Sequence, residues 1–199
     1  MRKAYILTCN QESQRSIFSK EVLDNVGFES IFFNCIPHKN KVLSNKISML
    51  KIYENIANGE DDWVYVFEDD INILKPIKVS EIIEYENISP IFFYLGVCIP
   101  SYYNSKNNLV IYNKEINNSK IYGIKGGVRG LHAIAISKQG AKLLLDFAKD
   151  YESYEYMDMI LEKFSEKYPA PVINPELESY IYGHRGIFFQ DRNKFPSTI

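Results

Sequence analysis

The sequence predicts an α/β fold in which a mostly parallel central sheet is flanked by helices. Short runs rich in β-branched and aromatic residues alternate along the chain with segments whose apolar residues recur at helical spacing. One run, "PIFFYLGVCIP" at residues 90–100, is almost continuously apolar, which is typical of a strand covered on both faces. With 199 residues, 46% of them hydrophobic, the chain can bury a full core, and we expect a single domain over residues 1–199.

Five segments are expected to form strands because they are short, apolar and bounded by polar or turn-forming residues. They are residues 3–8, 30–36, 63–70, 90–100 and 131–137. Four segments carry an apolar stripe at helical spacing and are expected to be helices: residues 11–26, 44–57, 138–149 and 156–164. Gly27 and the pair Asn58-Gly59 are natural stops for the first two helices. Residues 101–120 are expected to form a surface excursion, and the tail 179–199 is expected to be irregular.

Composition argues against several classes of protein. The formal charge of −2, without a basic stripe, gives no nucleic-acid signal. Cys9, Cys35 and Cys98 are scattered without CxxC spacing, which argues against a disulfide framework or a zinc site and favours a reducing compartment. The first apolar run is too short for a signal peptide and no later run is long enough to span a membrane, so we expect a cytoplasmic protein. The oligomeric state stays open.

Three adjacent carboxylates, Glu68-Asp69-Asp70, end the apolar run "WVYVFEDD". Ligands of such sheets bind beyond the carboxyl ends of the strands, and hard oxygen ligands there suit Mg²⁺ or Mn²⁺. Strand alternation points Glu68 and Asp70 one way and Asp69 the other, so Asp70 is expected to bind the metal directly, with Glu68 at the ribose or a metal-bound water. A solvated turn of acids would give the same triplet, but the apolar residues on both sides favour a site. Because there is no phosphate-cradling glycine loop, a nucleotide would be held through a metal and side chains.

The chain resembles glycosyltransferase family 25, the lipooligosaccharide and collagen-type sugar transferases with a GT-A fold. The opening "AYILTCNQESQRSIFSKEVLDNVGFESIFFNCI" looks like the family's first strand, arginine-bearing loop, helix and second strand, with Arg15 at that arginine. The family carries a Ser-His pair about twenty residues before its EDD, a spacing that fits a helix and a loop. Here Ser48 keeps that register and Met49 replaces the histidine. Later segments that resemble the family are "GLHAIAISKQGAKLLLDFA", "YMDMIL" and "FFQDRNKFPSTI".

This resemblance implies transfer of a sugar from a nucleotide sugar, UDP-linked in most of the family, to a hydroxyl group of a glycan or glycoprotein. It also implies Mn²⁺, or Mg²⁺, bridging Asp70 and the donor diphosphate and acting as a Lewis acid on the leaving group. The abundance of Ile, Asn, Lys and Tyr is typical of an AT-rich genome, and a viral member would act in the host cytoplasm. The residues that we assign to the donor are Thr8, Arg15, Ser48, Glu68, Asp69 and Arg185.

A general base is needed as well, because an alcohol is too weakly acidic to lose its proton unaided. Asp158 is the candidate, since it opens the predicted helix in "YMDMIL" and matches the family's late aspartate. An ordinary acid that complements a helix dipole at the N-terminus explains Asp158 equally well.

Histidines and arginines near the C-terminus and in the glycine-rich stretch are further candidates for binding the metal or the phosphates. His184 is assigned as a further metal ligand beside Asp70 and Glu68, although a lone histidine next to glycine is more often a hydrogen-bonded loop residue. Arg185 and Arg129 match phosphate oxygens chemically, and each is equally consistent with a solvated surface charge. His132, just before "AIAIS", is expected to be structural.

Two rival functions remain. A catalytically inactive protein of the same fold, used for binding or assembly, is favoured slightly by Met49 and disfavoured by the intact EDD. A nucleotidyltransferase or phosphatase is ranked last, because "YILTCNQE" has neither an aspartate nucleophile on the first strand nor a Gly-Ser before paired acids.

Overall fold

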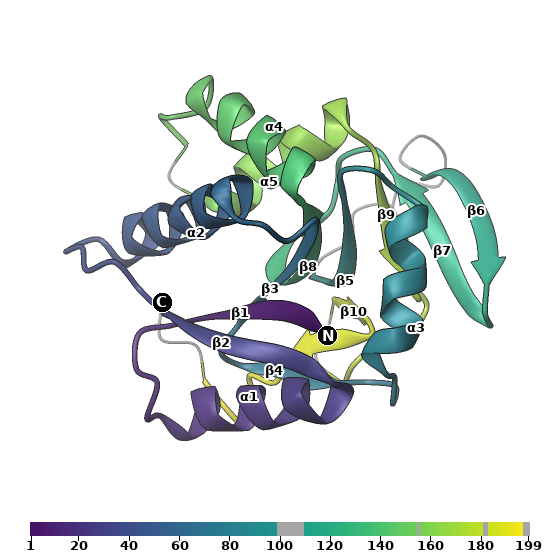
Figure 1. The fold of residues 1–199 in the computed structure, drawn as a ribbon, viewed down its shortest axis with the longest axis horizontal. Coiled ribbons are helices and arrows are strands. Elements are labelled where there is room, and N and C mark those ends of the chain that lie inside the picture. Colours follow the sequence, from purple (N-terminus) through teal and green to yellow (C-terminus); the bar gives the residue numbers. More distant parts are fainter. Residues whose placement is uncertain (99–109, 155, 181–182, 197–199) are drawn as a thin grey trace.

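The computed structural model describes residues 1–98, 110–154, 156–180 and 183–196. Strands and helices alternate along most of the chain, as predicted (Figure 1). The helices are α1 (Gln14–Val26), α2 (Lys41–Asn58), α3 (Val79–Ile83), α4 (Lys138–Lys149) and α5 (Met157–Lys167), with a 3₁₀ turn at Glu84–Asn87. The strands are β1 (Arg2–Thr8), β2 (Phe28–Asn34), β3 (Trp63–Glu68), β4 (Ile71–Ile73), β5 (Phe92–Cys98), β6 (Val110–Ile116), β7 (Ser119–Ile124), β8 (Arg129–Ser137), β9 (Ala170–Ile173), β10 (His184–Gly186) and β11 (Phe188–Gln190).

The main sheet has the order β2-β1-β3-β8-β5-β9-β7-β6, with β10 paired to β5. β1 runs parallel to both β2 and β3, and β5 runs parallel to β9. β8 is inserted antiparallel between β3 and β5. Among the described strands of this sheet, β2, β1, β3, β5, β9 and β6 therefore run one way and β8, β7 and β10 the other. The predicted mostly parallel sheet is confirmed in this sense.

Helices cover both faces of the sheet, because successive strand residues point to opposite sides. On β3, Val64 and Val66 enter the core formed with α2, α4 and α5. Tyr65 and Phe67 enter the second core, with α1 and α3. Figure 1 shows α1 on one side of the sheet and α2, α4 and α5 on the other. A strand buried on both faces explains why the third strand reads as a continuous apolar run.

Two segments, the predicted surface excursion and the predicted irregular tail, contain short strands that the sequence did not predict. Part of the predicted surface excursion forms β6 and β7, joined by Asn117-Asn118, whose positive φ angles of 51° and 59° fit a tight hairpin turn. Figure 1 shows this hairpin at one edge of the molecule, which is why β6 is exposed and lacks an alternating pattern. Residues 99–109, which include the end of the predicted strand 90–100, lie outside the described residues.

The predicted irregular tail also contains two short strands, β10 and β11. β10 adds to β5, and β11 pairs with β4 just after the acidic triplet. Gly96 on β5 lets the tail approach, since a Cβ atom there would lie 2.3 Å from the Phe188 carbonyl oxygen. The Asp191 amide then donates a 2.7 Å hydrogen bond to the Asp70 carbonyl. The C-terminal segment is thereby held against the end of β3.

Within the described residues, none of the helices combines the length and the apolar composition needed to cross a membrane.

Candidate functional site

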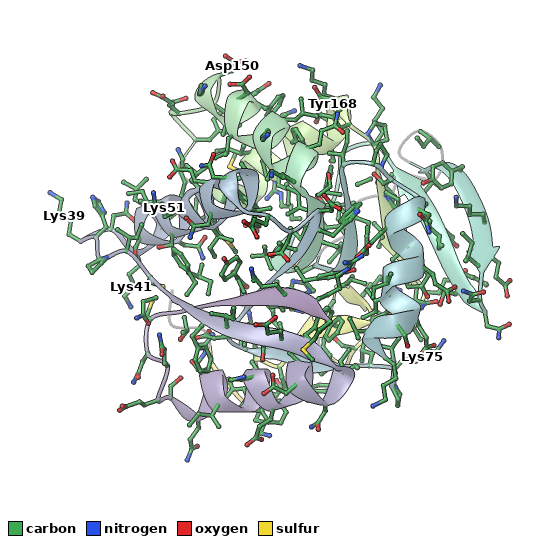
Figure 2. All side chains as sticks on the ribbon, viewed as in Figure 1. Lys39, Lys41, Lys51, Lys75, Asp150 and Tyr168 are labelled. Carbon is green, nitrogen blue, oxygen red and sulfur yellow. The ribbon has the colours of Figure 1, made fainter. Side chains whose placement is uncertain are left out.

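A cavity of about 500 Å³ opens beyond the carboxyl ends of β1 and β3. Glu68, Asp69 and Asp70 form part of its wall, so the acidic triplet lies where ligands of α/β sheets bind. Three cationic side chains face the same space: Arg15, Lys41 and Arg192. Figure 2 shows Lys41 at the start of α2. The cavity thus combines three carboxylates with three cationic side chains. The cationic side chains suit a ligand with a phosphate group.

Arg15 joins two of the acids. Its Nη2 atom lies 2.7 Å from Asp69 Oδ1 and 3.1 Å from Asp70 Oδ2. Thr8, at the end of β1, donates a 2.7 Å hydrogen bond to Asp69 Oδ2, and Ser16 lies 3.3 Å from the same oxygen. Arg15 reaches the acids because it stands in the first turn of α1, which begins after its N-cap Ser13. The donor residues Thr8, Arg15 and Asp69 predicted from the sequence therefore meet at one point.

Gln190 contacts two acids of the triplet, Glu68 and Asp70. Its Nε2 atom donates to Glu68 Oε2 at 2.5 Å and lies 3.3 Å from Asp70 Oδ1. Its Oε1 atom accepts a 3.0 Å hydrogen bond from Arg192 Nη2. Gln190 stands at the end of β11, in the tail that was expected to be irregular, and it was noted only as part of a resembling segment. Arg192 was not singled out at all.

The triplet is crowded and buried, which disfavours full ionisation. Burial, followed by the charges of Asp70 and Asp158, raises the pKa of Glu68 well above its usual value. Burial also raises the pKa of Asp70, while the Arg15 charge opposes that shift. The cationic groups are therefore needed to keep these carboxylates charged.

The side chains of the three acids point in the predicted directions only in part. Glu68 and Asp70 share the Gln190 amide, as strand alternation predicts. Asp69 does not point away, because Arg15 contacts both Asp69 and Asp70 and all three acids line the cavity. The reason is that β3 ends at Glu68, so the two aspartates lie in a turn where alternation no longer applies.

A second cavity, of about 250 Å³, contains Asp158. Asp158 lies in the first turn of α5, and burial raises its pKa. Lys46 on α2 holds the preceding segment, since its Nζ donates to the carbonyls of Glu152 and Tyr154 at 2.8 and 2.6 Å. Tyr156, half-exposed, stands on the wall of the same cavity. This arrangement places a carboxylate of raised pKa beside an open space.

The two cavities share a wall formed by Asn45, Glu68, Gln190 and Arg192. Molecules bound in the two spaces would therefore meet across the Glu68–Gln190 pair. Asp158, on α5, lines only the smaller cavity, and Asp69 and Asp70, after β3, line only the larger one. The sequence analysis identified the triplet and Asp158, but it could not show that the two cavities they line share a wall.

Three residues assigned from the sequence lie elsewhere. Ser48 is fully buried and accepts a 2.7 Å hydrogen bond from the Ile36 amide while donating to the Ser44 carbonyl at 2.6 Å. Arg185 pairs with Glu178 at 2.9 Å and lines neither cavity. The Ser48 and Arg185 assignments are therefore corrected: Ser48 fixes the connection from β2 to α2, and Arg185 belongs to β10. Arg129, the other arginine considered, pairs with Glu162 at 3.1 Å.

His184 is also placed apart from the acids. It is buried, its ring stacks on His132 at a centroid distance of 5.6 Å, and its Nδ1 atom accepts from the Gln190 amide at 3.3 Å. Burial lowers the pKa of both histidines, to about 4 for His184 and about 3 for His132. His184 therefore supports the backbone at Gln190. His132 is fully buried, and the structural role expected for it stays a prediction.

The donor set for a metal ion is smaller than predicted. Within the residues that the structure describes, no group of three or more His, Cys, Asp or Glu side chains is arranged to hold a metal. Glu68 and Asp70 remain adjacent, since the Gln190 amide reaches both. Mg²⁺ often takes only one or two protein carboxylates and completes its shell with substrate phosphates and water. The residues thus fit an ion that arrives together with a phosphorylated ligand.

No family model matches the chain, and no curated protein matches it. Several solved structures are similar to it. A glycosyltransferase involved in glycosylation of the major capsid of PBCV-1 is 8% identical, with 82% of this chain and 72% of that chain covered and a TM-score of 0.43. An active-site mutant of LgtC is 10% identical, with 84% and 70% covered and a TM-score of 0.46.

A third similar structure is a mutant of the Drosophila β1,4-galactosyltransferase 7 in complex with manganese, UDP-Gal and xylobiose. It is 9% identical, with 98% of this chain and 73% of that chain covered and a TM-score of 0.40. The identities and TM-scores are low, so these likenesses by themselves assign neither a family nor an activity to this chain.

Proposed function

We propose that this protein is a glycosyltransferase of GT-A type that moves a sugar from a nucleotide sugar, UDP-linked, to a hydroxyl group of a glycan or glycoprotein. One observation carries the proposal: the larger cavity with its acids and arginines adjoins a smaller cavity with Asp158, across a shared wall. A two-substrate transfer needs this arrangement, because donor and acceptor must be held side by side with the reacting atoms in contact.

The larger cavity is assigned to the donor. Arg15, Lys41 and Arg192 provide the positive charge that a diphosphate requires, and guanidinium groups match phosphate oxygens in geometry. Thr8 and Asp69 hold Arg15 in place. Its volume of about 500 Å³ lies in the range of small-molecule sites.

We assign Glu68 and Asp70 to a divalent ion, Mn²⁺ or Mg²⁺, that binds with the donor. When bound there, the ion would stabilise the negative charge that develops on the departing nucleoside diphosphate. Arg15 already contacts Asp70, and so this residue would share its carboxylate between the guanidinium and the ion.

The smaller cavity is assigned to the acceptor, with Asp158 as the base. Its carboxylate would accept the proton of the acceptor hydroxyl while the oxygen forms its bond to the sugar carbon and the nucleoside diphosphate departs. A pKa raised by burial makes the carboxylate a stronger proton acceptor than an exposed aspartate. Membership of family 25 is part of the proposal, and the position of the family's histidine is here the fully buried Met49.

The decisive test is a paired measurement on Asp158→Asn. The change keeps the side-chain size but removes the proton acceptor, so we expect the transfer rate at saturating UDP-sugar to fall by ~10²–10⁴. UDP affinity measured by calorimetry should not change, since Asp158 lines only the acceptor cavity. Asp150→Asn, at the exposed end of α4, is the matched control and should transfer at the wild-type rate. Transfer by Asp158→Asn within a few-fold of wild type would refute the assignment.

An inactive binding protein is the rival function. It predicts that the wild-type chain binds UDP but neither transfers the sugar nor hydrolyses the donor. Screening UDP-sugars with Mn²⁺ by thermal shift, followed by a hydrolysis assay on those that bind, separates the two functions.

A further inference from the structure

Two of the cysteines that are scattered in the sequence lie together in the fold. Cys9 follows β1 and Cys35 follows β2, and these parallel strands pair in register up to Thr8 and Asn34. The pairing continues for one residue, because the Cys35 amide donates a 2.8 Å hydrogen bond to the Thr8 carbonyl. Cys9 and Cys35 are therefore neighbours across the strand ends.

This geometry suits a disulfide bond. Adjacent strands lie ~4.8 Å apart, within the Cα–Cα range of about 4.4–6.8 Å that disulfides span. Both cysteines line the larger cavity, where Cys9 is exposed and Cys35 is partly buried. Cys98 lies on β5 and lines the other cavity. The chain thus places two thiols at neighbouring positions on the wall of the larger cavity.

We propose that Cys9 and Cys35 form a redox-active dithiol that a small disulfide, such as glutathione disulfide, converts reversibly into an intramolecular disulfide. The Cys9 thiolate attacks one sulfur of the small disulfide, which forms a mixed disulfide and releases one small thiol. Cys35 then loses its proton to solvent and attacks the Cys9 sulfur, releasing the second small thiol. The protein loses two electrons and two protons, and the small disulfide gains them.

The order of the two attacks follows from the surroundings of each sulfur. Cys9 is the exposed thiol and is the one that an external disulfide can reach. Burial raises the pKa of Cys35, so Cys35 stays a thiol until Cys9 has reacted. Cys35 is then the resolving residue of the pair.

Oxidation should weaken nucleotide binding, an inference that rests on the proposed donor site. Thr8 precedes Cys9 and holds Asp69, which in turn holds Arg15. We expect a new covalent bond beside Thr8 to draw the ends of β1 and β2 together and so to disturb this chain of contacts. We expect the oxidised protein to bind UDP about tenfold more weakly than the reduced protein, equivalent to ~1.4 kcal/mol.

The test uses the full chain, reduced and then incubated with glutathione disulfide. Remaining thiols are alkylated, and the intact protein and its peptides are weighed. We expect the oxidised protein to be two hydrogen atoms lighter, with Cys98 alkylated and Cys9 and Cys35 not, and we expect dithiothreitol to reverse the change. Cys98→Ser should form the same bond. Cys35→Ser should stop at a glutathione adduct on Cys9.

UDP affinity is then measured for the reduced, oxidised and re-reduced protein. A wild-type chain that stops at the glutathione adduct, or that pairs through Cys98, overturns the dithiol. A disulfide with unchanged UDP affinity overturns its control of the donor site. If the reduced protein binds no UDP while the disulfide still forms, the proposed function fails and the dithiol stands, so the two failures are distinguishable.

Discussion

Arg15 balances the charge of two acids in the larger cavity. One nitrogen of its guanidinium contacts Asp69 and Asp70, and its removal would leave two crowded carboxylates without that partner. A hydrogen bond to a charged group contributes about 1.5–3 kcal/mol, and we therefore expect Arg15→Ala to lower UDP affinity by about 10–100-fold. The measurement is calorimetry with UDP. Arg185→Ala, which lines neither cavity, is the control, and equal losses in the two variants would show that Arg15 has no special role.

His132 determines how the protein responds to acid. Burial and the nearby His184 lower its pKa from 6.5 to about 3, so the unfolded chain binds a proton that the folded chain does not bind in this interval. Stability must therefore fall as the pH falls from 6.5 towards 3, by up to ~1.4 kcal/mol per pH unit. His184, whose pKa is lowered to about 4, adds a loss of the same sign.

We expect His132→Asn to reduce this slope by about one proton, whatever its effect on absolute stability. Urea unfolding at a series of pH values between about 5 and 6.5 measures the slope directly. The exposed Gln139→Ala, which removes no titratable group, should leave the slope unchanged. An unaltered slope in His132→Asn would contradict the lowered pKa of His132.

Single residues could be assigned from the sequence where they belong to a distinctive local pattern. The acidic triplet was found because it interrupts an apolar run, and the structure places it, with Arg15 and Thr8, on one cavity wall. Ser48 and His184 were misassigned because a lone serine or histidine carries no signal of burial. Gln190 and Arg192 could not be assigned, since no local pattern shows that a tail folds back onto residues some 120 positions earlier.

Among the elements, long segments with strong periodicity were predicted and short ones were not. The apolar runs of β3 and β5 and the stripes of α1, α2, α4 and α5 agree with their predicted positions within a few residues. β4, β10 and β11 have three residues each, too few for a period to appear. The β6–β7 hairpin was missed because β6 is exposed on both faces, although Asn117-Asn118 is a turn signal.

Helix α4 offers a test of packing against propensity. Alanine normally stabilises a helix by about 1 kcal/mol relative to glycine. At Gly140, however, a Cβ atom would lie 2.2 Å from the Ile91 carbonyl oxygen, which already accepts from the Ser137 amide at the N-cap. We expect Gly140→Ala to lower the free energy of unfolding by about 1–3 kcal/mol, as overpacking does. Chemical denaturation measures it, with exposed Gln139→Ala as a control expected to be nearly neutral; a stabilised Gly140→Ala would contradict the contact.

For the whole molecule, the site depends on contacts between distant parts of the chain. β1 and β3 bring Thr8 and the triplet together, and α2 and α5 contribute to the smaller cavity. Gln190 and Arg192, in the C-terminal segment, complete the wall between the two cavities. The sequence predicted the layers and the sheet, because these follow from periodicity. It could not predict that two cavities share a wall, because that depends on where the tail packs.

The shared wall makes a prediction that separates the two cavities. Thr8→Val removes the hydroxyl that donates to Asp69 in the donor cavity, so UDP affinity should fall while the acceptor KM stays unchanged. Tyr156→Ala removes a half-exposed ring from the acceptor cavity, so the acceptor KM should rise about tenfold, equivalent to ~1.4 kcal/mol, with UDP affinity unchanged. Tyr156→Phe keeps the ring and is the control.

Gln190→Ala should affect both quantities, because Gln190 holds Glu68 and Asp70 and supports Arg192 in the wall itself. We expect UDP affinity and the acceptor KM to worsen together in this variant, and the transfer rate to fall as well. Calorimetry with UDP and steady-state kinetics with varied acceptor give both quantities for all four variants. If Thr8→Val and Tyr156→Ala each altered both quantities equally, the two spaces would be one binding site, and the division into donor and acceptor sides would be wrong.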